Sequence, residues 1–312
     1  MSMPVQFIET GERKQGADGH FVAICNGIKV AECSLWWKRV PNLTGEVLGI
    51  VGHFSATETS GSALLNHACE QLRSQGCTMA VGPMDGNTWR SYRLITEFGS
   101  EPPFFMEMNH PPSWADQFRR AGFSSLAEYT SALAADLDVT DSRIESAERR
   151  LRDRGIILRS LRIDSLDEDL SHIYALSIQS FQNNFLFTPT AESEFMEQYR
   201  PIRDIVWPEL VILAFDGVRP VGFVFAIPDY LEPQRGAAAV TVILKTLAVL
   251  PRAGMAGLGN VLVSRIHNEA QRLGFKRVIH ALMHEDNASR NLSGHYAKEF
   301  RRYALFSRKL SP

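Results

Sequence analysis

The chain has 312 residues, of which 45% are hydrophobic and 22% are charged, a composition typical of soluble globular proteins. At about 150 residues per domain, this length predicts two domains, each large enough to bury its own core. A formal net charge of −2 argues against nucleic acid or an anionic membrane surface as a partner.

The predicted elements of the N-terminal half begin with a hairpin. Asn26-Gly27 is a two-residue turn signal between apolar runs at 21–25 and 29–35. Alternating strands and helices are expected after it, in the order 46–54, 61–72, 78–81, 114–121 and 126–132. Residues 55–61 contain a single glycine and the acidic Glu58, whose charge would repel a phosphate group.

Two passages lie outside this regular pattern. Residues 82–93 and 102–107 combine aromatic residues, arginines and turn residues at high density, which favours a pocket wall or a contact between the halves. Residues 138–153 are rich in charged residues, and we expect them to form an exposed helical linker.

The C-terminal half repeats the same kind of element series. The hairpin signal here is Asp216-Gly217, and the repeated order predicts a tandem fold. The expected strands are 155–162, 209–215, 220–226, 278–283 and 302–310, and the expected helices are 166–181, 192–199, 260–273 and 291–300.

A glycine-rich loop links a strand to a helix in this half. The apolar run that begins at Thr246 stops at Pro251, and Gly254, Gly257 and Gly259 precede the helix. Glycine lets the backbone curl tightly, so that N–H groups and the positive end of the helix dipole face a ligand. The loop therefore predicts a site for phosphate or pyrophosphate.

This stretch resembles the acyl-CoA-binding segment of the GNAT superfamily of N-acetyltransferases. That family reads Val-x-Pro, then Arg or Gln three residues on, and then Gly-apolar-Gly, and here Val249-Leu250-Pro251 and Gly257-Leu258-Gly259 stand at the matching places. The Arg or Gln position is Gly254, a departure from the pattern. The resemblance implies an α/β (α+β) fold with two tandem GNAT-like domains, 1–137 and 155–312, joined by a linker at 138–154. Each would have a mixed, largely antiparallel central sheet flanked by helices.

The resemblance also implies a site. The co-substrate would be acetyl-CoA or another acyl-CoA, with no metal, and the acceptor would be the amine of a small molecule or of an amino-acid-like substrate. A backbone N–H on the strand at 247–250 would hold the thioester oxygen. The coenzyme contacts implied are Leu247, Val249, Gly254, Gly257, Leu258, Gly259, Asn260 and Asn287. Since only the C-terminal loop is glycine-rich, we expect one coenzyme per chain, bound by that half.

The catalytic candidates are Tyr296 and His284. The family often has a tyrosine seven residues after the Asn, as general acid, but that position is Gly294 here, and Tyr296 lies two residues further on. Tyr296 is therefore either the acid or a core aromatic residue, and Ser293 beside it is a possible contact for the coenzyme sulfur or a water. His280, His284 and Glu285 are candidate bases.

Other readings stay open at this point. One is a regulatory protein that holds acyl-CoA without turnover, and another is an aminoacyl-tRNA-dependent transferase, since some of those also use two GNAT-like halves. The acyl acceptor and the acyl chain length are not defined. The longest apolar run, 237–250, contains Lys245 and is shorter than the ~20 residues that span a bilayer. Without CxxC spacing among the four cysteines or a signal-peptide core, we expect a cytoplasmic protein with reduced thiols.

Overall fold

The computed structural model describes residues 5–138, 141–252, 254–286, 293–294 and 296–310. Its strands are β1 (Gln6–Thr10), β2 (Gly19–Cys25), β3 (Ile28–Trp36), β4 (Leu48–Ala56), β5 (Met79–Gly82), β6 (Leu94–Glu97), β7 (Ser124–Ala134), β8 (Ile156–Ser160), β9 (Val211–Asp216), β10 (Arg219–Pro228), β11 (Thr241–Val249), β12 (Arg277–His284) and β13 (Lys298–Lys309). Its α-helices are α1 (Gly61–Ser74), α2 (Ser113–Arg120), α3 (Ser142–Asp153), α4 (Leu166–Phe181), α5 (Glu192–Tyr199), α6 (Leu231–Gln234) and α7 (Leu258–Arg272).

The strands form one continuous sheet through the described part of the chain. Its order is β1-β2-β3-β4-β5-β13-β7-β12-β11-β10-β9-β8, with β6 paired to β13 outside this path. The pairs β4–β5 and β11–β12 are parallel, and the other pairs are antiparallel. The predicted mixed, largely antiparallel architecture with flanking helices is confirmed.

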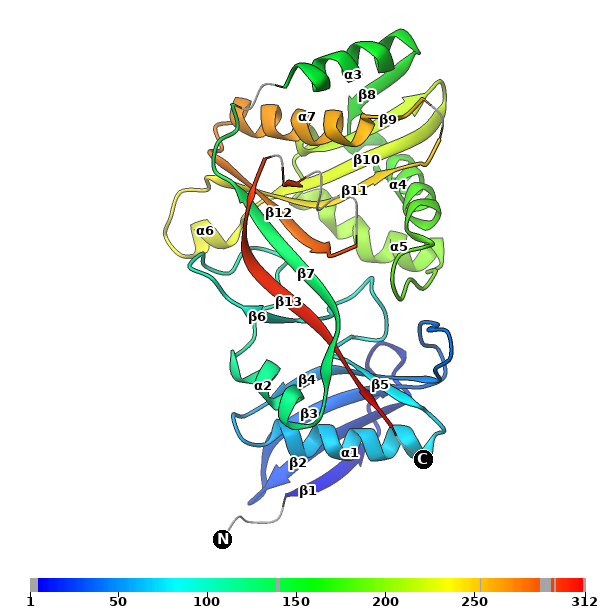
Figure 1. The fold of residues 1–312 in the computed structure, drawn as a ribbon, viewed down its shortest axis with the longest axis vertical. Helices are drawn as coiled ribbons and strands as arrows, with labels where there is room; N and C mark the ends of the chain where they lie inside the picture. The colour runs from blue at the N-terminus through cyan, green and yellow to red at the C-terminus, as the bar shows by residue number, and fades with distance from the viewer. Residues whose placement is uncertain (1–4, 139–140, 253, 287–292, 295, 311–312) are drawn as a thin grey trace.

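Each half has a helix that packs on the sheet after a parallel strand. Helix α1 buries Leu64, Leu65, Ala68 and Leu72, and α7 buries Val261, Leu262, Ile266 and Ala270, spacings that place the apolar side chains on one helix face. Figure 1 shows α1 at the N-terminal end of the molecule and α7 with α3 at the other, while α4 and α5 lie on the opposite side of the C-terminal sheet.

Two long strands, β7 and β13, join the halves (Figure 1). β13 pairs with β5 at Phe306–Gly82 and with β7 at Tyr303–Tyr129, and β7 continues to β12 at Ala134–Val278. Thus β13, the last strand in the sequence, pairs with β5 and belongs to the sheet of the N-terminal half. It begins at Lys298, after a turn at 296 and an irregular residue at 297, so the helix expected at 291–300 is wrong over 296–300. Residues 287–292 and 295 lie outside the described residues.

Helix α3 is formed as predicted, but it is not an exposed linker. Asp141 caps its first turn by accepting a hydrogen bond from the Arg143 N–H at 2.8 Å. Ile144, Ala147 and Leu151 are buried in the core cluster that contains α7. The spacing of three and four residues puts them on one face, which the dense charge around them obscures in the sequence.

Candidate functional site

The strands β11 and β12 separate halfway along their length. Their parallel pairing runs from Thr241–Arg277 to Leu244–His280 and then ends. Beyond that point β11 stays paired with β10 as far as Val249, while β12 stays paired with β7 after a register shift between His280 and Met283. A gap therefore opens in the sheet immediately before the glycine-rich loop.

The backbone of β11 presents polar groups to this gap. The Leu250 N–H donates to the Val221 carbonyl at 2.9 Å, toward the β10 side. Because successive residues of a strand point their N–H groups to opposite neighbours, the amides of Leu247 and Val249 face the side that β12 has left. They are oriented to receive an extended chain or a carbonyl oxygen.

The glycine-rich loop follows at the end of the gap. Gly254 and Gly257 have φ values of +86° and +87°, in the left-handed region that favours glycine. Gly257 is the N-cap of α7, so the N–H groups of its first turn lie at the loop. The Leu258 N–H donates to the Met255 carbonyl at 3.0 Å, and the next two N–H groups, of Gly259 and Asn260, are those with no acceptor inside the helix. Leu258 is fully buried, so its side chain packs in the core and is not available to a ligand.

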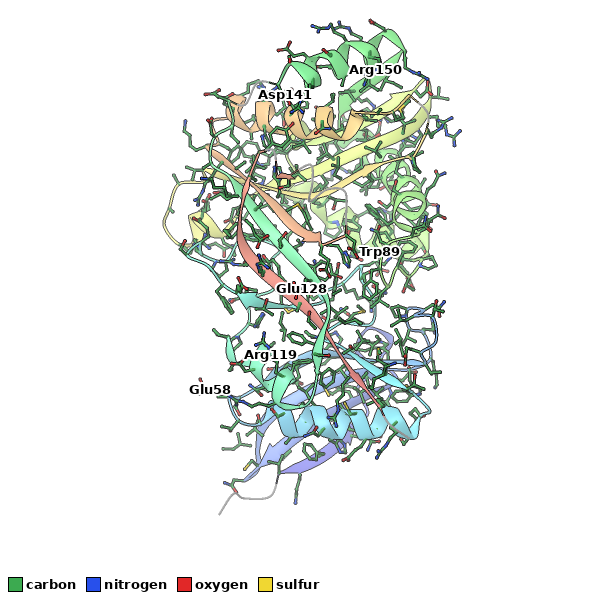
Figure 2. The ribbon with its side chains drawn as sticks, in the orientation of Figure 1. Glu58, Trp89, Arg119, Glu128, Asp141 and Arg150 are labelled. Carbon is green, nitrogen blue, oxygen red and sulfur yellow. The ribbon has the colours of Figure 1, made fainter. Side chains whose placement is uncertain are left out.

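Arginines of α3 lie over this loop. A Cβ placed on Gly254 would collide with the guanidinium of Arg154, and Arg150 Nη2 donates to the Ala256 carbonyl at 2.8 Å. Figure 2 shows Arg150 on α3, the helix above α7. Gly254 occupies the position at which the GNAT pattern has Arg or Gln. The Arg154 guanidinium, which comes from the end of α3, lies against this position instead. This contact could not be predicted from the sequence, because α3 lies about a hundred residues before the loop.

A cavity of about 340 Å³ opens on the gap. It is lined by β11, β12, α4 and α5, and by residues of the aromatic passage at 82–93. Its wall is mainly apolar, with the aromatic side chains Phe181, Phe185, Phe187, Phe195, Phe223 and Phe225.

The aromatic passage serves both roles that its composition suggested. Trp89 lines the cavity, and its indole N–H donates to the Thr188 carbonyl at 2.7 Å. Gln198 of α5 donates to the Trp89 carbonyl at 3.2 Å, and Figure 2 shows Trp89 beside this helix at the boundary between the halves. The passage is both a wall of the cavity and a contact between halves.

A cationic group, Lys245, lies at the cavity wall on β11. Burial, together with the charge of Arg93, lowers its pKa from 10.5 to about 7. Lys245 Nζ donates to the Met106 carbonyl at 3.4 Å. The sequence did mark this residue as a charge inside an apolar run, but it did not indicate a role.

His280 lies in a buried chain of polar side chains. Its Nε2 lies 2.9 Å from His267 Nε2, and its Nδ1 lies 2.9 Å from the hydroxyl of Ser293. Burial lowers the pKa of His267 to about 4, and burial and His267 lower that of His280 to about 3. Both rings are therefore uncharged near neutral pH, and Ser293 points inward.

Tyr296 packs over these histidines. Its ring centroid lies 5.2 Å from that of His267, and its half-buried side chain contacts the core cluster around α7. Among the described residues, the cavity wall includes His280 but neither Tyr296 nor His284. Both predicted catalytic roles stay predictions, and the packing of Tyr296 favours its role as a core residue.

His284 ends β12 behind the cavity wall, where its ring centroid lies 5.7 Å from that of the lining residue Phe185. Its ring packs edge-on against Tyr129 with centroids 5.0 Å apart, and its Nδ1 accepts the Asp286 N–H at 3.1 Å. Burial lowers its pKa. Glu285 is bound to β7, since its Oε1 accepts the Glu128 N–H. Asn287 lies outside the described residues.

The corresponding gap in the N-terminal half is filled by its own chain. The Met84 N–H donates to the Val51 carbonyl at 2.9 Å, and Asp85 Oδ1 accepts the His53 N–H at 2.6 Å. A Cβ on Gly52 would collide with the Met84 carbonyl. Residues 83–85 thus lie against β4, where a coenzyme arm would have to fit.

The start of α1 is also covered. Trp114 of α2 donates to the Ala56 carbonyl at 3.1 Å, and Gln117 donates to the Thr57 carbonyl at 3.1 Å. A Cβ on Gly61 would collide with the side-chain oxygen of Gln117. Glu58 is exposed at the edge of this half (Figure 2). Both observations support the assignment of coenzyme binding to the C-terminal half.

No protein-family model matches the chain. A bacterial ceramide synthase from Caulobacter vibrioides is 25% identical over 174 residues, which are 55% of this chain and 44% of that protein. Protein YghO from Escherichia coli is 23% identical over 189 residues, which are 58% of this chain and 48% of that protein. The alignments span less than half the length of these curated relatives.

Solved structures match nearly the whole chain. A tandem GNAT protein from the clavulanic acid biosynthesis pathway has a TM-score of 0.54 and 17% identity, covering 94% of this chain and 83% of that one. A GCN5-related N-acetyltransferase from Sphaerobacter thermophilus has a TM-score of 0.52 and 14% identity, covering 94% and 81%. Among the described residues, no helix is long and apolar enough to cross a membrane. The chain has a tandem GNAT fold.

Proposed function

We propose that the protein is a CoA-dependent N-acyltransferase whose C-terminal half transfers an acyl group from acyl-CoA to an amine. The observation that carries the proposal is the gap between β11 and β12, which lies between the glycine-rich loop and the apolar cavity. The loop and its arginines suit the pyrophosphate, the amides of β11 suit the pantetheine arm, and the cavity suits the reacting groups.

The chemistry follows from the positions of these groups. The amine attacks the thioester carbonyl, whose oxygen gains negative charge in the transition state. A fixed backbone N–H at Leu247 or Val249 stabilises that charge in a site that excludes water. The residues fit the coenzyme because the loop supplies free N–H groups and two guanidinium groups lie at its edge.

We further propose that at least one substrate carries an apolar chain longer than acetyl. The cavity has the size of sites that hold drug-sized ligands, and its aromatic wall suits hydrocarbon. The match to a bacterial ceramide synthase supports the same proposal, since a ceramide is a long-chain amide. Acetyl-CoA is the co-substrate expected from the sequence, so turnover of longer acyl-CoA substrates is compared with turnover of acetyl-CoA.

Thiol release tests the proposal directly. The protein is mixed with acetyl-CoA or decanoyl-CoA, with dodecylamine or methylamine as acceptor, and free CoA is measured with a thiol reagent. We expect dodecylamine-dependent release, and faster turnover of decanoyl-CoA than of acetyl-CoA at equal concentration. Coenzyme binding without release in any pair would favour the acyl-CoA-binding protein, and preference for acetyl-CoA with methylamine would contradict the long-chain proposal.

A further inference from the structure

Lys245 occupies an irregular position in β11. The register with β10 pairs Leu244 with Ala226 and Thr246 with Phe225, so Lys245 is an extra residue with no partner opposite. Such a bulge re-aims a side chain and is common next to active sites. The residue before it, Leu244, makes the last pair with β12, so Lys245 lies where the gap begins.

The Lys245 amine lies on the sheet face away from α7. Val242 and Leu244 pack in the core cluster with α7, whereas Ile243 packs against Phe104 on the other face. The contact of Lys245 Nζ with the Met106 carbonyl, two residues after Phe104, puts the amine on that second face. The glycine-rich loop leads into α7, so coenzyme and Lys245 approach the gap from opposite faces.

The surroundings of Lys245 hold few groups that stabilise a charge. Among the described residues, the Met106 carbonyl is its hydrogen-bond acceptor, at 3.4 Å. The Glu107 carboxylate accepts hydrogen bonds from Arg301 Nη1, at 2.5 Å, and from the Tyr303 hydroxyl. Arg93 adds a like charge, and His280 at the cavity wall is uncharged near neutral pH. Burial and the charge of Arg93 lower the Lys245 pKa to about 7, against the opposing charge of Glu107, so the amine can lose its proton near neutral pH.

Backbone strain is concentrated around the same group. Arg93, Met106 and Leu282 have φ values of +74°, +64° and +61°, unusual for residues with side chains. Arg93 lies between the rings of Tyr92 and Tyr129, and its Nη1 donates to the Leu282 carbonyl at 3.1 Å. Such outliers gather at functional sites, where the surrounding structure holds them in place.

We propose that Lys245 is the general base that accepts the proton of the acceptor amine during acyl transfer. This inference rests on the proposed function. As the amine nitrogen bonds to the acyl carbon, its proton passes to the Lys245 nitrogen. The carbon–sulfur bond then breaks, and CoA leaves as the thiolate with the bonding electron pair. The thiolate takes up a proton from water, and Lys245 returns its proton to the solvent, which restores both the water and the base. The nitrogen becomes more acidic as it forms the amide, so a base of this strength suffices.

Two substitutions at this position test the role. Lys245→Met removes the base, and Lys245→Arg keeps a positive charge that does not deprotonate. With decanoyl-CoA and dodecylamine, we expect both variants to lose ~10²-fold or more in kcat, with the KM for decanoyl-CoA little changed. In the wild-type protein, kcat/KM for the amine should fall below about pH 7, where Lys245 is protonated. Lys276→Met, at an exposed lysine, is the matched control and should keep wild-type turnover.

A direct titration of Lys245 tests the inference without relying on turnover, and so independently of the proposed function. The labelling rates of Lys245 and Lys276 by an amine-reactive reagent are measured against pH by mass spectrometry. We expect a midpoint near pH 7 for Lys245, against about 10.4 for an unperturbed lysine. Activity in Lys245→Arg, or a Lys245 midpoint near 10, would overturn the inference. Absence of turnover in wild-type protein with a midpoint near 7 would instead contradict the proposed function alone.

Discussion

Arg154 places a positive charge beside Gly254, a position at which the glycine-rich loop has no side chain. Its guanidinium lies against Gly254, at the position where the resemblance leads us to expect an Arg or Gln side chain. A guanidinium suits a phosphate because its N–H groups form charge-assisted hydrogen bonds in pairs. In the proposed function, the loop backbone and the arginines at 150 and 154 would together bind the pyrophosphate.

Removal of this charge should weaken coenzyme binding. For Arg154→Gln we expect roughly a tenfold rise in the Kd for CoA, since one charged hydrogen bond on an exposed site is lost. Arg152→Gln, on the same helix and equally exposed, is the control and should leave the Kd unchanged. The KM for S-decanoyl-pantetheine, which lacks the pyrophosphate, should not respond to either change. An equal loss with CoA and with pantetheine would show that Arg154 acts on the fold.

Gly257→Asp is a less informative probe of the same loop. Gly257 has a positive φ, and a Cβ there would lie 2.8 Å from the Ala147 Cβ on α3. Substitution would strain the backbone and displace α3 as well as introduce a charge. Loss of coenzyme binding in that variant would not distinguish repulsion from damage to the helix.

Tyr296 is either a core residue or the general acid, and one pair of variants distinguishes these two alternatives. Its ring packs on His267 and on the core around α7, and burial raises its pKa. We expect Tyr296→Phe to keep near-wild-type turnover, and Tyr296→Ala to lower the melting temperature, because a large side chain leaves the core. Turnover and melting temperature are measured on both proteins. A ~10²-fold loss of turnover in Tyr296→Phe at unchanged melting temperature would instead identify the general acid.

At the scale of the elements, the sequence defined the regular helices and strands well. The hairpins at Asn26-Gly27 and Asp216-Gly217 and the helices α4, α5 and α7 stand close to their expected positions, because local periodicity and turn chemistry specify them. The short strands β1 and β6 were missed, since five and four residues carry little periodic signal.

Elements that depend on distant partners were harder to predict. The apolar face of α3 consists of only three buried residues among arginines and glutamates. Its burial against α7 depends on the tertiary structure and could not be predicted from the local sequence. Lys245 was visible as a charge in an apolar run, but its bulge and its pKa depend on β10, β12 and Arg93. The glycine-rich loop could be predicted, because its glycines lie close together in the sequence and directly precede a helix.

At the scale of the whole molecule, the two halves share strands but differ in their gaps. The N-terminal gap is occupied by residues 83–85 and its helix start is covered by Trp114 and Gln117. The C-terminal gap opens on a cavity of about 340 Å³. The shared strand pair β7–β13 keeps the N-terminal passage, with Trp89 and Arg93, in the wall of the C-terminal cavity. The N-terminal half thus supports the site without forming a second one.

Calorimetric titration of the full chain with CoA tests this account most directly. The account predicts a stoichiometry of one coenzyme per chain, because one gap is open and one is filled. It also predicts that Arg154→Gln weakens this single binding event and leaves its stoichiometry unchanged. Two binding events per chain, or no binding by a folded protein, would contradict it.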